Sequence, residues 1–130
     1  MFIRLYLIAL SMFFALDIIW LGVVAKRFYA KQLGPLMKTK VGWPAAIAFY
    51  LLFVGGLVTL VIFPAVQVES FQRALISGAV FGGCCYATYD LTNLATLKGW
   101  PKTLTIVDIG WGSLLTASVA AATCFVALHL

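Results

Sequence analysis

Four long apolar stretches, separated by short connections, restrict the folds open to this chain. They cover residues 2–25, 43–66, 72–96 and 103–128. As a helix rising about 1.5 Å per residue, each is long enough to cross a hydrocarbon layer of about 30 Å. With 64% hydrophobic and only 10% charged residues, lipid is the expected solvent. The sequence therefore predicts an all-α integral membrane four-helix bundle that forms a single domain over residues 1–130.

The first apolar stretch imitates a signal peptide, because Arg4 precedes an apolar run. The run, however, continues past Asp17 to about residue 25, and no small-x-small cleavage site precedes a polar start. We therefore expect this stretch to be the first membrane span.

The distribution of basic residues predicts the orientation in the membrane. Connections 26–42 and 97–102 hold seven basic residues, whereas the opposite side holds only Arg4 and Arg73. The positive-inside rule then places both basic connections in the cytoplasm of a bacterial inner membrane and both termini outside. The chain has a net charge of +5, and its basic residues lie between the apolar stretches and not on one polar face. Anionic membrane lipids are therefore the expected partner, and nucleic acid is not.

Two sequence matches at the same offset predict an internal repeat. Gly-Trp-Pro at 42–44 recurs at 99–101, and Gly-Gly-Leu-Val-Thr at 55–59 matches Gly-Ser-Leu-Leu-Thr at 112–116. These matches indicate two pseudo-symmetric helical hairpins, although convergent use of common membrane residues gives similar matches.

Small residues at helical spacing indicate close helix packing. Gly78 and Gly82 are four residues apart in the third stretch, as are Ser113, Ala117 and Ala121 in the fourth. Such spacing lets helix backbones approach, within one chain or in a homodimer.

Three of the four acidic residues, Asp17, Asp90 and Asp108, lie inside the apolar stretches. An ionisable group at that depth costs about 2.5–3.5 kcal/mol on insertion scales, so the default interpretation is functional. Counting from the nearest basic connection places all three at similar depth in the cytoplasmic half. No basic residue lies at this depth, so either protons neutralise some of the carboxylates or a cation is bound. The alternative is that they are hydrogen-bonded links between helices.

Aromatic and amide side chains accompany the aspartates one helical turn away. Trp20 and Trp111 each follow an aspartate by three residues, a spacing that places side chains on one face. The predicted site for protons or a ligand comprises Asp17, Asp90, Asp108, Asn93, Tyr86, Tyr89, Trp20 and Trp111. Cys84, Cys85 and Cys124 are interpreted as packing residues. The only histidine, His129, is next to last, so neither a haem nor a zinc site is expected, and any cofactor or metal remains unknown.

Three motifs carry a resemblance to a known family. They are Asp-Ile-Ile-Trp-Leu-Gly at 17–22, Tyr-Asp-Leu-Thr-Asn-Leu-Ala-Thr-Leu-Lys-Gly-Trp-Pro at 89–101 and Asp-Ile-Gly-Trp-Gly at 108–112. With them the chain resembles, over essentially its whole length, a bacterial family of small predicted inner-membrane proteins that is classed as a domain of unknown function. The resemblance implies a four-span membrane protein and no catalytic role for any residue.

Three classes of function remain open. The first is a transporter or binding protein whose carboxylates take protons and a small cation or cationic solute, with aromatic rings available for cation–π contact. The second is a membrane-embedded enzyme, or an enzyme's partner, in lipid modification, for which a general acid or base is present but no nucleophile–base pair or metal motif. The third is an accessory subunit of a larger membrane complex.

Overall fold

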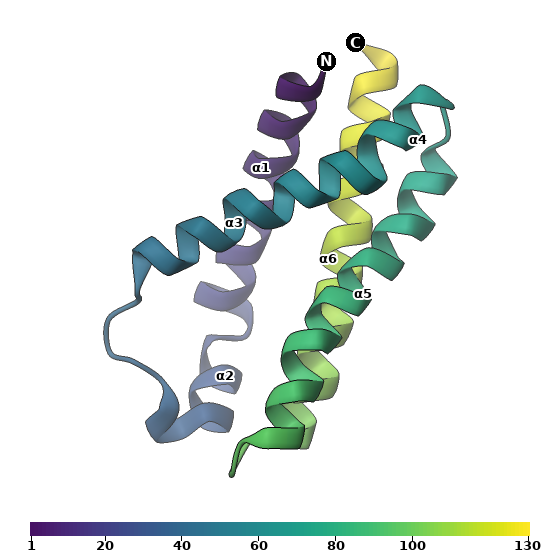
Figure 1. Ribbon diagram of the computed structural model, residues 1–130. Coiled ribbons are helices and arrows are strands. Elements are labelled where there is room, and N and C mark those ends of the chain that lie inside the picture. Colours follow the sequence, from purple (N-terminus) through teal and green to yellow (C-terminus); the bar gives the residue numbers. More distant parts are fainter.

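The computed structural model describes residues 1–130, and its regular elements are all helical (Figure 1). Most of the chain lies in long helices, and short π and 3-10 turns interrupt or extend them. In chain order the elements are α1 Phe2–Ile19, the π turn η1 Trp20–Val24, α2 Lys26–Leu33, the 3-10 turn η2 Gly34–Leu36, α3 Trp43–Leu57, the π turn η3 Val58–Ile62, α4 Phe63–Gln67, α5 Phe71–Thr96 and α6 Lys102–His129.

Three of the four predicted spans are helices long and apolar enough to cross a membrane. They are Phe2–Val24, Trp43–Gln67 and Lys102–His129. The fourth predicted span forms α5, which has 26 residues and is about 39 Å long at 1.5 Å per residue. It is less apolar than the other three because threonine and tyrosine residues, Arg73 and Asp90 lie along it, so the fourth crossing stays a prediction.

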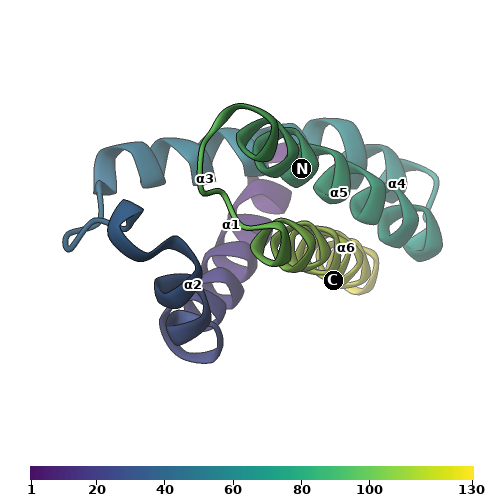
Figure 2. The same ribbon diagram turned by 90° about the horizontal axis from the view of Figure 1, so that it is seen from below.

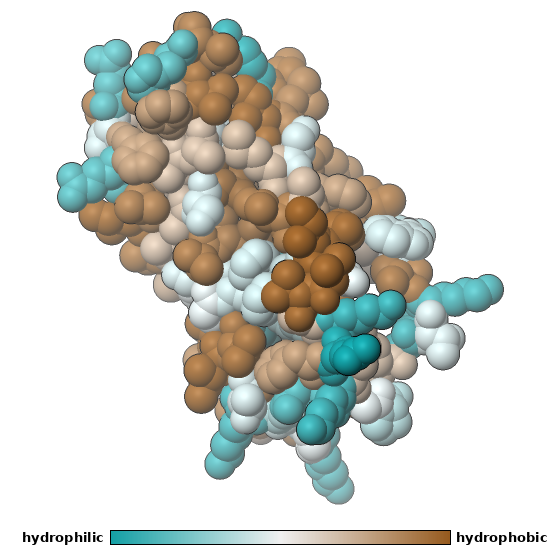
Figure 3. Space-filling model, turned by 180° about the vertical axis from the view of Figure 1, so that it is seen from behind, coloured by the Kyte–Doolittle hydropathy of each residue, from teal (hydrophilic) through white to brown (hydrophobic).

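The polar connections and the termini lie at opposite ends of the molecule. Figure 1 shows both termini at one end, and α2 and the turn between α5 and α6 at the other. Figure 3 shows hydrophilic side chains at both ends of the molecule, more of them at this second end, with a mostly hydrophobic surface between. This arrangement fits the predicted separation of the basic connections from the termini, while the side that faces the cytoplasm stays a prediction.

Helices α5 and α6 are packed so closely that glycine is required between them. A Cβ atom added to Gly78 would come within 2.9 Å of the Cβ of Ala120, and one added to Gly82 would overlap the side chain of Thr116 and the carbonyl oxygen of Gly112. This is the approach that small residues at a spacing of four permit between membrane helices. The sequence prediction of close packing is therefore confirmed for Gly78 and Gly82.

These contacts define an antiparallel register between α5 and α6. Gly78 faces Ala120 and Gly82 faces Thr116. An advance of four residues along α5 therefore corresponds to a decrease of four residue numbers along α6. One turn further, the ring of Tyr86 lies directly on Gly112. Continuing the same register by one turn on each helix brings position 90 opposite position 108.

The two predicted hairpins are packed differently. Helices α5 and α6 run side by side in both views, whereas α3 crosses α1 obliquely in Figure 1. Figure 2 shows α2 and the start of α3 on one side of the α5–α6 pair. The internal repeat therefore stays a prediction from sequence, and the helix packing adds no support to it.

Proline, glycine and serine residues determine where helices break and begin. Pro64 has no backbone N–H to donate, and the turn before it, η3, has π-type bonding. Gly34 ends α2 with a φ of 53°, a conformation that favours glycine. The Ser70 hydroxyl begins α5 by accepting a hydrogen bond of 3.0 Å from the backbone N–H of Arg73.

The main apolar core lies where α1, α3, η3 and α6 meet, and Leu5, Phe13, Leu57, Ile62 and Leu115 are its largest fully buried side chains. Many other large hydrophobic side chains are exposed on the outer surface, as expected for a protein surrounded by lipid. The core fixes one end of the bundle, and the polar residues inside the helices gather nearer the other end.

The α5–α6 contact predicts a large difference between two neighbouring glycines. Gly82→Ala should lower the free energy of unfolding by about 1–3 kcal/mol, because the new methyl group overlaps Thr116 and the Gly112 carbonyl. Gly83→Ala is the matched control, since its methyl group would make an ordinary contact at 3.7 Å with Ser113. Thermal unfolding in lipid nanodiscs measures both variants. Equal stability of the two would contradict the close α5–α6 packing.

The fourth crossing is tested by chemical labelling. Single cysteines placed at Glu69 and Gly99, in a background without Cys84, Cys85 and Cys124, should react with a membrane-impermeant maleimide from opposite sides of sealed vesicles. The two positions flank α5, which is long enough to separate them by one bilayer. Labelling of both from the same side would show that α5 does not cross.

Candidate functional site

The carboxyl group of Asp17 joins three helices. It accepts a hydrogen bond of 2.7 Å from the Tyr50 hydroxyl of α3 at Oδ2 and one of 3.0 Å from the Trp111 indole N–H of α6 at Oδ1. Asp17 is 5% exposed. Two donors on one carboxyl group replace part of the stabilisation that an ionised carboxylate loses when it leaves water.

A stacked pair of indoles links Asp17 to a second carboxyl group. The rings of Trp20 and Trp111 are 4.4 Å apart between centroids and nearly parallel, at 8°. The Trp20 indole N–H donates to the Tyr29 hydroxyl over 3.1 Å, and the Tyr29 hydroxyl donates to Oδ1 of Asp108 over 2.6 Å. A continuous series of contacts therefore runs from Asp17 on α1 to Asp108 on α6.

The local backbone at Trp20 departs from the α-helix. Trp20 begins the π turn η1, which is closed by a 2.7 Å hydrogen bond from the Ala25 N–H to the Trp20 carbonyl. Single π turns inside helices are frequent at functional sites. Here the turn joins α1 to α2, and so links Trp20 to the helix that carries Tyr29.

Tyr29 acts as a neutral donor. Burial between the helices, followed by the hydrogen bond to Asp108, raises the pKa of the Tyr29 phenol above its ordinary value. The phenol therefore keeps its proton throughout the physiological pH range. The hydrogen bond from Tyr29 to Asp108, which attaches α2 to α6, is therefore kept at neutral pH.

Asp90 differs from the other two aspartates because no donor reaches it. Its side chain is 0% exposed, and neither carboxylate oxygen has a hydrogen-bond partner. The register of α5 and α6 instead places Asp90 opposite Asp108. Asp90 and Asp108 therefore form a pair of facing carboxyl groups.

A cavity of about 440 Å³ lies beside this network. Two carboxyl groups and six aromatic rings contribute to its wall, and apolar side chains complete it. The lining residues are Asp17, Leu21, Ala46, Phe49, Tyr50, Phe53, Cys85, Tyr86, Tyr89, Asp108 and Trp111.

The cavity wall includes five of the eight residues predicted from sequence: Asp17, Tyr86, Tyr89, Asp108 and Trp111. The other three lie outside the wall. Trp20 stacks on Trp111, Asp90 is fully buried opposite Asp108, and Asn93 follows Tyr89 by one turn of α5.

The two tryptophans that follow aspartates by three residues donate to groups on other helices. Trp111 donates to Asp17 of another helix and not to Asp108, three residues before it. Trp20 donates to Tyr29 and not to Asp17. Since an indole N–H reaches well away from its own backbone, the nearest acceptor after packing belongs to a neighbouring helix.

Sequence reasoning missed all the aromatic residues that the second span and the first basic connection contribute to the site, as well as Leu21, Ala46 and Cys85 of the cavity wall. Tyr50, Phe49 and Phe53 lie in an apolar stretch where aromatic residues read as ordinary membrane packing. Tyr29 lies in the basic connection and reads as a surface residue. Tyr50 did carry a signal, because it is the only tyrosine in the second span and a buried hydroxyl needs a partner.

The carboxyl groups do not converge on one point. No group of three or more His, Cys, Asp or Glu side chains is placed to hold a metal ion. Asp17 thus serves two purposes at once: it links helices, as the structural alternative expected, and it also lines the cavity.

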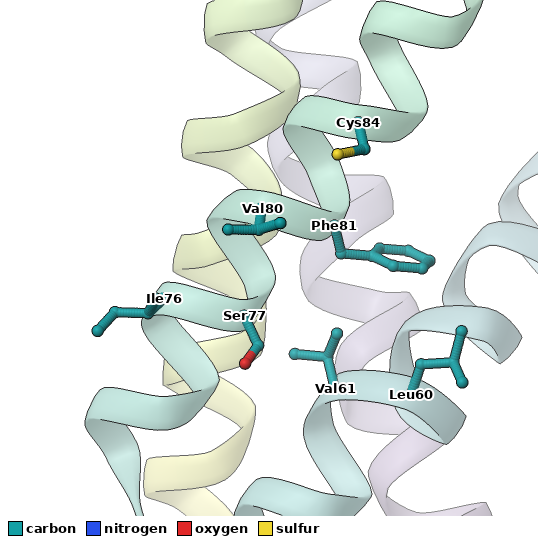
Figure 4. A pocket seen from close by; sticks show the side chains of 7 residues that line it. All are labelled: Leu60, Val61, Ile76, Ser77, Val80, Phe81 and Cys84. Carbon is teal, nitrogen blue, oxygen red and sulfur yellow. The ribbon is translucent and has the colours of Figure 1, made fainter.

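A second cavity, between α5 and η3, has a different character. Figure 4 shows it with Leu60, Val61, Ile76, Ser77, Val80, Phe81 and Cys84 around it. Six of its seven lining residues are hydrophobic, and none is an aspartate. It offers an apolar surface to lipid and contains none of the predicted site residues.

The chain belongs to the family described as Predicted membrane protein (DUF2177), whose model matches residues 2–125. This match confirms the family resemblance drawn from the aspartate motifs. A search of the curated proteins and a search of the solved structures find no match.

The Tyr29 contact predicts a change in the dynamics of α2. Tyr29→Phe removes the donor to Asp108 and the acceptor of Trp20. Amide hydrogen exchange over residues 26–33 should become about tenfold faster, which corresponds to about 1.4 kcal/mol of lost local stability. Lys31→Gln, on the exposed side of α2, should leave the exchange rate unchanged. An unaltered rate in Tyr29→Phe would show that this contact does not hold α2.

Proposed function

We propose that this member of the membrane protein family binds a small organic cation in the cavity beside Asp17 and Asp108, in exchange with protons. One observation carries the proposal: the cavity wall combines two carboxyl groups with six aromatic rings. Carboxylates supply negative charge, and aromatic faces attract cations by about 0.5–2 kcal/mol each. This is the composition expected of a site for a cationic solute.

The absence of a paired basic side chain supports the same conclusion. The hydrogen-bond partners of Asp17 and Asp108 are tyrosine and tryptophan, which carry no charge. Negative charge that is buried without a counter-ion is costly. A ligand with positive charge would supply the counter-ion that the chain itself does not.

The arrangement of the side chains favours an organic cation over a bare metal ion. Metal ions of the hard type take six or more oxygen ligands at about 2–2.6 Å, and the aspartates are not grouped for this. The aromatic rings Phe49, Tyr50 and Trp111 instead present broad surfaces around the cavity. Such surfaces suit alkylammonium or arylammonium groups.

We further propose that α5 crosses the membrane beside α6. Its exposed threonines have their hydroxyl groups satisfied within the helix: Thr88 donates to the Cys84 carbonyl over 2.7 Å, Thr96 donates to the Thr92 carbonyl over 2.8 Å, and Thr92 donates to the Thr88 carbonyl. A hydroxyl that is satisfied in this way can face lipid at low cost.

For the location we propose a bacterial inner membrane, with the basic connections in the cytoplasm and both termini outside. The exposed Lys26, Arg27 and Lys31 of α2 would then face anionic lipid headgroups. Membrane lipids are therefore the proposed partners of the surface.

The cation site is tested by binding of benzyltrimethylammonium to purified protein in nanodiscs, measured by isothermal titration calorimetry. The native protein should bind, and Asp17→Asn should weaken binding at least about tenfold, because the variant removes one negative charge from the wall. Glu69→Gln is the control, since Glu69 is outside the cavity lining and its loss removes the same charge. Absence of binding to the native protein, or equal binding by Asp17→Asn, would contradict the proposal.

A further inference from the structure

The carboxyl group of Asp90 is the one acidic group whose bonding the network does not explain. It is fully buried, and both of its oxygens lack a hydrogen-bond donor. Burying an ionised carboxylate without donors costs several kcal/mol of folding free energy. Asp90 therefore needs either a proton of its own or a partner that supplies one.

The helix register fixes what Asp90 faces. Because Gly82 faces Thr116 and Tyr86 lies on Gly112, Asp90 cannot rotate away from α6 without breaking the glycine contacts. The acidic side chain opposite Asp90 in this register is that of Asp108. Two facing carboxyl groups satisfy each other when one carries a proton, which then lies between two oxygens.

The surrounding groups offer no other means of compensating the charge. From α6 Asp90 faces Asp108, and on its own helix the nearest titratable side chains are Tyr86 and Tyr89. From α2, Tyr29 reaches Asp108 and not Asp90, and from α1 the titratable group is Asp17, across the cavity. No lysine or arginine is among them.

We infer that Asp90 and Asp108 share one proton, and that this pair is a proton-binding site distinct from Asp17. Asp108 lines the cavity and Asp90 does not. The proton therefore lies at the edge of the cavity, and the carboxyl group of Asp108 separates it from a ligand.

The connection between this proton and cation binding rests on the proposed function. A cation bound beside the Asp90–Asp108 pair favours release of the shared proton, because like charges repel. The shared proton then leaves to bulk water, so that one positive charge enters and one departs, and both carboxyl groups are ionised while the cation is bound. No covalent bond other than O–H is broken.

Infrared spectroscopy of the full chain in nanodiscs tests the shared proton. At pH 7 the native protein should show the carbonyl band of a protonated carboxyl group. The band should be lost in Asp90→Asn, because the new amide donates to the Asp108 carboxylate. The band should also be lost in Asp108→Asn, which replaces the first variant as the test if Asp90→Asn does not fold. It should be kept in the control variant Asp17→Asn. Absence of the band from the native protein, or its persistence in both pair variants, overturns the inference.

A separate measurement tests whether cation binding releases the shared proton. Benzyltrimethylammonium added to weakly buffered native protein should release about one proton per bound cation, read with a pH indicator dye. Asp90→Asn should still bind the cation and release none. Equal release by Asp90→Asn overturns the link. If the native protein binds no cation, the proposed function fails, and the infrared band still decides whether the proton is shared.

Discussion

The close contact between α5 and α6 is the constraint on which the polar site depends. Glycines at 78 and 82 let the two backbones approach until Ala120 and Thr116 fill the space above them. Within lipid the hydrophobic effect does not drive helices together, because lipid tails are as apolar as the side chains. Close packing of this kind, together with hydrogen bonds, therefore has to hold the helices together. Once the register is set, it determines what Tyr86 and Asp90 face on α6, so the position of the polar site follows from the glycine contacts.

The polar network connects the parts of the chain that the glycine contact does not reach. Asp17 holds α1 to α3 and α6, and Tyr29 holds α2 to α6. An interhelical hydrogen bond in a membrane contributes only about 0.6–2 kcal/mol. Buried carboxyl groups are therefore a costly way to join helices, whereas in the proposed function the cavity beside them gives Asp17 and Asp108 a second use. The structural interpretation and the proposed function therefore concern the same residues.

The sequence predicted the helices and five of the eleven residues that line the cavity, and it could have predicted the carboxyl pair. Gly78, Gly82, Tyr86 and Asp90 recur every four residues, as do Asp108, Gly112, Thr116 and Ala120, so aligning the glycine contacts of two antiparallel helices would place Asp90 opposite Asp108. The donors Tyr50 and Tyr29 could not be assigned in this way. Their positions depend on the crossing of α3 over α1 and on the turn after Trp20, and helical spacing within one segment carries no information about either.

Charge balance explains why the two carboxyl sites are arranged differently. Asp17 accepts hydrogen bonds from two neutral donors, whereas Asp90 has none and depends on its neighbour. With one proton shared, as we propose, the Asp90–Asp108 pair carries one negative charge in place of two. A cation that displaces the shared proton leaves the total charge unchanged, so the exchange adds no net charge to a region of low dielectric, where extra charge is most costly. An exchange of this kind needs a second carboxyl group that the ligand does not touch, and the position of Asp90 behind Asp108 meets that need.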